Sequence, residues 1–194
     1  DTSSMTYVIS NMFVIVLFLI PILTMRLLSE DKKQKTDQAL FTAPISLTKI
    51  AMGKYLSAVI VYALCLVVFV LEALVIACFT TPDWAVLLCS LLGMFLLGAA
   101  LIAIGMFISS LTESQVLAAV GGMAVGLAIY MIDQIASLSS ITFLNDILKK
   151  LSFTTHYQNF TIGVLNITDI VFFLSVCALF VFLTVRVFEK KRWS

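Results

Sequence analysis

Charged side chains are scarce in this sequence: they make up 12% of its 194 residues, about half the share found in a typical soluble protein. Hydrophobic residues make up 61%, and the mean hydropathy is +1.11. This composition excludes an ordinary soluble protein. The apolar runs are continuous, whereas a transmembrane β-barrel has short alternating segments. We therefore predict an all-α fold, a polytopic transmembrane helical bundle that forms one domain over residues 1–194.

Groups that carry catalysis or bind metals are scarce as well. The sequence has one histidine, His156, and four cysteines that lie in apolar runs without a close pair, so we find no metal or redox motif. Gly53-Lys54 lacks the other residues of a G-x-x-x-x-G-K-[ST] phosphate loop. We expect no catalytic residue and no metal, and an intramembrane enzyme is the weakest hypothesis. We interpret His156 as an ordinary external polar residue rather than a ligand or proton carrier.

Five apolar runs are long enough to cross a bilayer as helices. Pro21 interrupts the first run. A membrane helix tolerates proline because neighbouring groups satisfy the backbone group that proline leaves without a hydrogen bond. A short SLTES turn joins the third and fourth runs into a helical hairpin. The predicted spans cover, roughly, residues 7–24, 55–79, 85–110, 115–132 and 170–185.

Basic residues predict the sidedness, because loops next to membrane spans are enriched in Lys and Arg on the cytoplasmic side. Of the twelve Lys and Arg, only Lys149 and Lys150 fall in a segment that we place outside. This segment, residues 133–169, mixes charges with apolar clusters, as amphipathic helices on a membrane surface do. We predict that the chain starts outside and that its C-terminus is cytoplasmic.

The longest polar segment, residues 26–54, is predicted to be a cytoplasmic loop between the first two spans. Thr36 can cap a short helix, Asp37 suits the positive N-terminal end of that helix, and Pro44 stops it. Two hypotheses follow for this helix. It docks on a cytoplasmic partner, or it lies on the lipid headgroups with its lysines on the phosphates.

Polar and small residues inside the predicted spans are further candidates. Glu72 is an acidic residue well inside the second span, where a carboxylate is costly unless it faces protein or water. It lines a translocation path or ties the span to a neighbour. Glycines allow close approach of helices, and we favour packing within the bundle over a dimer seam. The packing candidates are Gly98, Gly105, Gly122 and Gly126.

The segment PILTMRLLSEDKKQKTDQALFTAPISLTKIAMGKYLSA, residues 21–58, resembles the signature of the transmembrane subunit of ABC-2 type transporters, closest to the gliding-motility group of permeases. The resemblance continues in residues 101–119 and 183–193. Lys35 and Gln38 stand where the family usually has glycine and glutamate. The matching positions are Pro21, Leu23, Thr24, Met25, Arg26, Glu30, Thr36, Leu40, Thr42, Pro44, Ile45, Ser46, Gly53 and Lys54.

The resemblance implies an exporter subunit in a bacterial inner membrane, coupled to a separate cytoplasmic ABC ATPase that binds the ATP and Mg. It also implies a second permease subunit, identical or related, across the pathway. Members of the family have six spans with both ends inside, so we expect the first family helix upstream of Asp1 or missing from this sequence. The residues expected to couple to the ATPase are Glu30, Thr36, Asp37, Gln38, Leu40, Phe41 and Pro44.

An alternative function belongs to a different class. The chain then acts as a membrane relay, which passes the motion of the ATPase to an external or periplasmic partner without solute transport. A polar cavity with Glu72 on its wall favours transport, whereas a dry, sealed bundle favours the relay. Membrane lipid is a further partner under both hypotheses, and we expect no nucleic acid.

Overall fold

The computed structural model describes residues 2–33, 46–77, 83–138, 150 and 152–192. Within these ranges the chain is all-helical and has no strand, as predicted. The helices are α1 (Thr2–Thr24), α2 (Ser29–Lys33), α4 (Leu47–Ala77), α5 (Trp84–Leu111), α6 (Gln115–Leu138), α8 (Phe153–Thr161) and α9 (Ile167–Arg192).

Five of the described helices are long and apolar enough to cross a membrane, which confirms a multi-pass membrane protein. The second span begins at Leu47, earlier than its predicted start, because its polar first turns are helical too. Helix α1 continues through Pro21 to Thr24. The candidate spans are Phe13–Asp31, Leu47–Leu71, Trp84–Leu111, Gln115–Ile132 and Ile167–Lys190.

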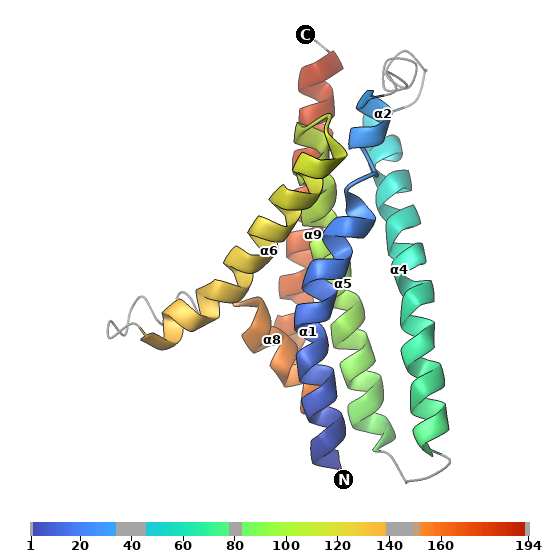
Figure 1. Cartoon of the computed structure of the whole chain (residues 1–194), viewed down its shortest axis with the longest axis vertical. Coiled ribbons are helices and arrows are strands. Elements are labelled where there is room, and N and C mark those ends of the chain that lie inside the picture. Colours follow the sequence, from blue (N-terminus) through green and yellow to red (C-terminus); the bar gives the residue numbers. More distant parts are fainter. Residues whose placement is uncertain (1, 34–45, 78–82, 139–149, 151, 193–194) are drawn as a thin grey trace.

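Helix α5 is the centre of the bundle, and α1, α4, α6, α8 and α9 all pack against it (Figure 1). Its small residues make this possible. A Cβ atom at Gly93 would overlap the Phe160 side chain of α8, one at Gly98 the Tyr62 ring of α4, and Gly105 lies equally close to α1. Glycine at these positions lets three neighbours approach the α5 backbone.

Two tyrosines of α4 hydrogen-bond to the backbone of α5. The hydroxyl of Tyr62 donates to the Met94 carbonyl at 2.9 Å, and that of Tyr55 donates to the Ala99 carbonyl at 3.2 Å. Tyr62 is buried. Because each ring spans the gap between the helices before its hydroxyl bonds, these contacts set both the spacing and the register of α4 on α5.

Helix α6 leans away from the bundle toward its far end, and α8 packs between α6 and the other helices (Figure 1). Gly122 and Gly126 hold the near half of α6 against α1: a Cβ there would lie 3.0 Å from Pro21 Cβ and 2.7 Å from Leu17 Cδ2, respectively. The part of the predicted amphipathic segment over 139–149 lies outside the described residues.

Helix α8 is amphipathic, but its apolar face is covered by protein. Phe153, Tyr157 and Phe160 recur at helical spacing, and all three are buried. The Tyr157 ring lies 5.6 Å from the Phe13 ring of α1, between centroids, and Ser90 of α5 donates a hydrogen bond to the Phe160 carbonyl at 3.3 Å. Protein therefore covers the apolar face of this helix, while Thr155 and Gln158 on its other face are exposed.

Candidate functional site

The candidate site lies at the end of the bundle that carries α2 and the end of α9, which we call the α2 end (Figure 1). Here the chain leaves α1, forms the short α2 and returns as α4. Glu30, one of the predicted coupling residues, is partly buried in α2. The other predicted coupling residues lie outside the described residues; they are Thr36, Asp37, Gln38, Leu40, Phe41 and Pro44.

Lys54 ties the return helix α4 to the segment that leaves α1. Its ammonium group donates a hydrogen bond to the Leu27 carbonyl at 2.8 Å and forms an ion pair with the Asp31 carboxylate of α2. The two charged side chains are 26% and 30% exposed, so solvent still screens part of their attraction. Lys54 therefore fastens together the two chain segments that flank residues 34–45.

Ser109 of α5 anchors the turn between α1 and α2. Its hydroxyl oxygen accepts hydrogen bonds from the backbone N–H groups of Leu28 at 3.2 Å and Ser29 at 3.0 Å, and the hydroxyl lies 3.3 Å from the Met25 carbonyl, to which it donates. Ser109 is fully buried. One side chain thus contacts three backbone groups of the turn and supplies the acceptor for two of its N–H groups, while the Met25 carbonyl also accepts from the Ser29 hydroxyl.

The last turn of α1 lies directly on the backbone of α5. Thr24 is buried and donates its hydroxyl to the Ile20 carbonyl at 3.0 Å, and a Cβ at Gly105 would overlap that hydroxyl. Lys54, Asp31, Ser109 and Thr24 together form what we call the junction. The junction joins α1, α2, α4 and α5 at the α2 end.

Ser109→Ala should reveal how strongly the junction is held. The variant leaves two buried backbone N–H groups without an acceptor, at a cost of about 1–3 kcal/mol in the free energy of unfolding for each unsatisfied group. Thermal unfolding in mild detergent, followed with a thiol-reactive dye that detects the buried Cys89 and Cys177, measures the loss. The matched control is Ser175→Ala, since Ser175 is exposed and bonds only within its own helix. Equal stability of the two variants would contradict the anchoring role.

Sequence reasoning did not select Asp31 or Ser109. Asp31 pairs with a residue 23 positions away and Ser109 with residues 80 and 81 positions away, so neither pair leaves a local spacing signal. Lys54 was noticed as part of the resemblance but not as a site residue. The useful signal was its position, a lysine in the second turn of a helix that enters a membrane, where an unpaired ammonium is unfavourable.

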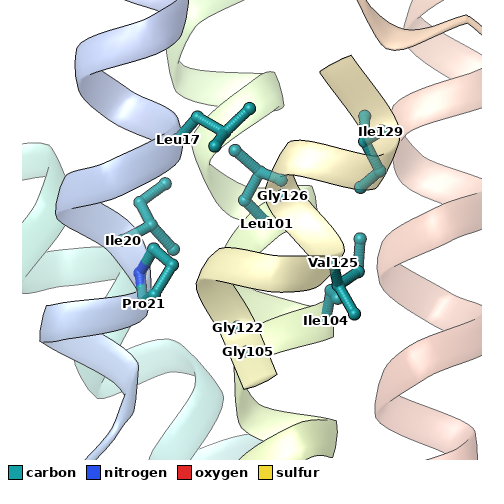
Figure 2. A pocket seen from close by; sticks show the side chains of 10 residues that line it. All are labelled: Leu17, Ile20, Pro21, Leu101, Ile104, Gly105, Gly122, Val125, Gly126 and Ile129. Carbon is teal, nitrogen blue, oxygen red and sulfur yellow. The ribbon is translucent and has the colours of Figure 1, made fainter. Parts of the chain in front are cut away.

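A small pocket lies where α1, α5 and α6 meet, and it is lined by apolar residues (Figure 2). Three of the predicted packing glycines, Gly105, Gly122 and Gly126, form part of its lining. Glu72 belongs to the far part of α4, and its side chain lies outside the described part of the chain. The other lining residues are Leu17, Ile20, Pro21, Leu101, Ile104, Val125 and Ile129.

Among the described residues, no group of three or more His, Cys, Asp or Glu side chains is arranged to hold a metal ion. The sequence model described as ABC-2 family transporter protein matches residues 2–193, nearly the entire chain. No curated protein matches the chain.

Proposed function

This chain belongs to the ABC-2 transporter family, and we propose that it couples ATP hydrolysis by a separate cytoplasmic ATPase to the movement of a substrate out across a bacterial inner membrane. Members of this family are membrane components of ABC transporters. The ATP and Mg would be bound by the ATPase, and the predicted coupling helix around Thr36–Pro44 would dock on it. A second permease subunit, identical or related, would complete the pathway.

The observation that carries this proposal is the junction. Residues 34–45, which hold most of the predicted coupling residues, are flanked by segments that Lys54 fastens together. Ser109 then bonds the same region to α5, the helix against which all the other long helices pack. A force on the docking segment would therefore be transmitted to the centre of the bundle through the hydrogen bonds of the junction.

The charge distribution supports a cytoplasmic location for the α2 end. Arg26, Lys49 and Lys54 lie there, and so do Arg186 and Lys190 of α9, whose end is at the same side of the bundle (Figure 1). Basic residues next to spans favour the cytoplasmic side. An ATPase in the cytoplasm would thus meet the junction directly.

The relay remains a second candidate, and one observation favours it. The pocket between α1, α5 and α6 is small and lined by apolar residues, so none of its lining side chains can hydrogen-bond a hydrophilic solute. A pathway between two permease subunits would be lined by other faces of the helices. Transport therefore stays the first proposal. The two functions are distinguished by measuring whether a solute crosses the membrane when ATP is hydrolysed.

The docking part of the proposal is tested by purifying the chain in mild detergent from cells that express its native operon and identifying the proteins that come with it. We expect an ABC ATPase with the natural chain and its loss from a Leu40→Asp, Phe41→Asp variant, because two carboxylates replace the apolar side chains of the docking helix. The matched control, Leu165→Asp with Ile167→Asp, places the same charges on residues 60% and 80% exposed at the opposite end. A variant that keeps the ATPase would move the lipid-surface hypothesis ahead.

A further inference from the structure

One face of α9 stays exposed along the whole helix in the described part of the chain. The opposite face packs on α5 and α4, and Phe173, Val181 and Phe188 are buried there. At 3.6 residues per turn the exposed positions below fall within about 100° of the helix circumference. We call this face the α9 stripe, and its members are Val171, Ser175, Leu179, Phe182, Arg186 and Lys190.

The α9 stripe changes from apolar to basic along its length. It carries no charge from Val171 to Phe182, and the Leu179 and Phe182 side chains are exposed as they would be toward lipid. Arg186 and Lys190, which follow, are both exposed and positively charged. The Arg186 guanidinium lies over the Phe182 ring, 4.9 Å from its centroid, in a cation–π contact. The apolar and basic parts of the stripe therefore meet without a gap.

This change occurs at the level of the membrane surface. Helices α5 and α9 lie side by side and run in the same direction (Figure 1), and the Phe107 and Phe180 rings mark one level, with 5.7 Å between their centroids. Helix α5 ends at Leu111, about 6 Å beyond Phe107, whereas Arg186 lies about 9 Å beyond Phe180. Arg186 is therefore level with residues 112–114, the polar turn that joins two spans and so lies outside the hydrocarbon layer.

Arg186 and Lys190 match the layer in which lipid phosphates lie. Their four-residue separation corresponds to about 6 Å along the helix axis, and each headgroup layer of a bilayer is about 5–8 Å thick. The Arg186 side chain is 61% exposed and donates one hydrogen bond, from Nη1 to the Glu189 carboxylate at 2.7 Å. A guanidinium has five N–H donors, so this bond leaves others that can meet a phosphate.

We propose that the α9 stripe is a binding site for an anionic phospholipid. Its acyl chain lies along Leu179 and Phe182, and its phosphate pairs with Arg186 and Lys190. The basic pair selects a headgroup with net negative charge, because a zwitterionic headgroup brings a cation of its own next to the two basic side chains. The inference does not depend on the proposed transport function.

Protein partners fit the α9 stripe less well than a lipid does. In a two-fold dimer the same patch of both subunits meets itself, and two copies with the same orientation in a membrane meet at equal depth. Arg186 and Lys190 would then lie against the same basic residues of the second copy, which is unfavourable. A protein in the water cannot reach the apolar part of the stripe, whereas a phospholipid matches both parts.

Native mass spectrometry of the full chain in mild detergent tests the site. Dioleoyl phosphatidylglycerol and dioleoyl phosphatidylcholine, which share their acyl chains and differ in net charge, are offered at equal concentration in separate samples. We expect the natural chain to retain more phosphatidylglycerol, and Arg186→Gln with Lys190→Gln to lower this preference by about fivefold for each charge removed. The matched control, Lys33→Gln with Lys49→Gln, removes two exposed lysines at the same end but outside the stripe, and should keep the preference. Equal retention of both lipids by the natural chain, or equal loss in the two double variants, would overturn the proposal.

A variant with the opposite expected effect guards against a loss that comes from misfolding. Glu189→Gln removes the carboxylate that competes for the Arg186 guanidinium, so it should raise the retention of phosphatidylglycerol by up to about fivefold. Excess inorganic phosphate should not displace the lipid from the natural chain, because the acyl chain contributes to binding as well. Displacement by phosphate, unchanged retention in Glu189→Gln, or a dimer in place of the lipid-bound chain would overturn the lipid assignment.

Discussion

Under the proposed function, Lys54→Met should leave the chain folded and able to bind an ABC ATPase but should uncouple the two. The variant removes the ammonium that joins Asp31 of α2 and the Leu27 carbonyl to α4, while the tyrosine contacts that seat α4 on α5 stay in place. Methionine keeps the length of the side chain and takes away its charge. Motion of the docking segment would then bend the junction instead of moving α5.

The size of the effect follows from the energies of coupling. Coupling between two sites is typically worth about 1–3 kcal/mol, or about 5- to 150-fold, and it is reciprocal for binding. We therefore expect the influence of the permease on ATP hydrolysis to drop by about tenfold, measured as the rate of the reconstituted complex against that of the ATPase alone. The unfolding temperature of the permease should change little, because Lys54 and Asp31 are partly exposed.

The matched control for this experiment is Lys33→Met. Lys33 is an exposed lysine at the end of α2, so the control makes the same substitution in the same region, away from the Leu27 and Asp31 contacts. A charge exchange, Lys54→Asp with Asp31→Lys, restores an ion pair but supplies no donor from α4 to Leu27, and should recover the coupling in part. Full coupling in Lys54→Met, or equal loss in Lys33→Met, would contradict a role for the junction.

The helical class and the five spans were predictable because the bilayer itself sets the length of an apolar helix. The ends of the helices were less predictable. Helix α4 begins at Leu47, ahead of the apolar run, and carries Lys49 and Lys54 in its first turns. Charged residues there are compatible with a helix whose start lies outside the apolar layer, so hydropathy alone places the boundary too late.

The candidate site was predictable in its location and not in its contacts. The polar segment 26–54 drew attention by its charge, but the pairing of Lys54 with Asp31 and of Ser109 with the α1 turn depends on how helices distant in sequence come together. The same holds for α8. The mixture of charges and apolar clusters over 133–169 indicated amphipathic helices, yet only the fold shows that Gly93 of α5 makes room for Phe160 and that protein covers the apolar face of α8.

Gly98→Ala is expected to destabilise the chain markedly although it adds a single methyl group. A Cβ at this position would overlap the Tyr62 ring, and the ring cannot swing aside without losing the hydrogen bond from its hydroxyl to Met94. Overpacking of this kind costs about 1–3 kcal/mol or more in the free energy of unfolding. The measurement is the unfolding temperature in mild detergent, read with the thiol-reactive dye.

Gly53→Ala is the matched control, because it makes the same substitution in a helix interior where the new Cβ meets no atom within 4 Å. It should gain about 0.5–1 kcal/mol, since alanine loses less backbone freedom on folding than glycine does. In a Tyr62→Ala background the clash disappears, so adding Gly98→Ala should cost nothing further, a strong non-additivity of neighbouring sites. If Gly98→Ala is as stable as Gly53→Ala, or if the two changes add, then close approach of α4 to α5 is not what requires glycine at position 98.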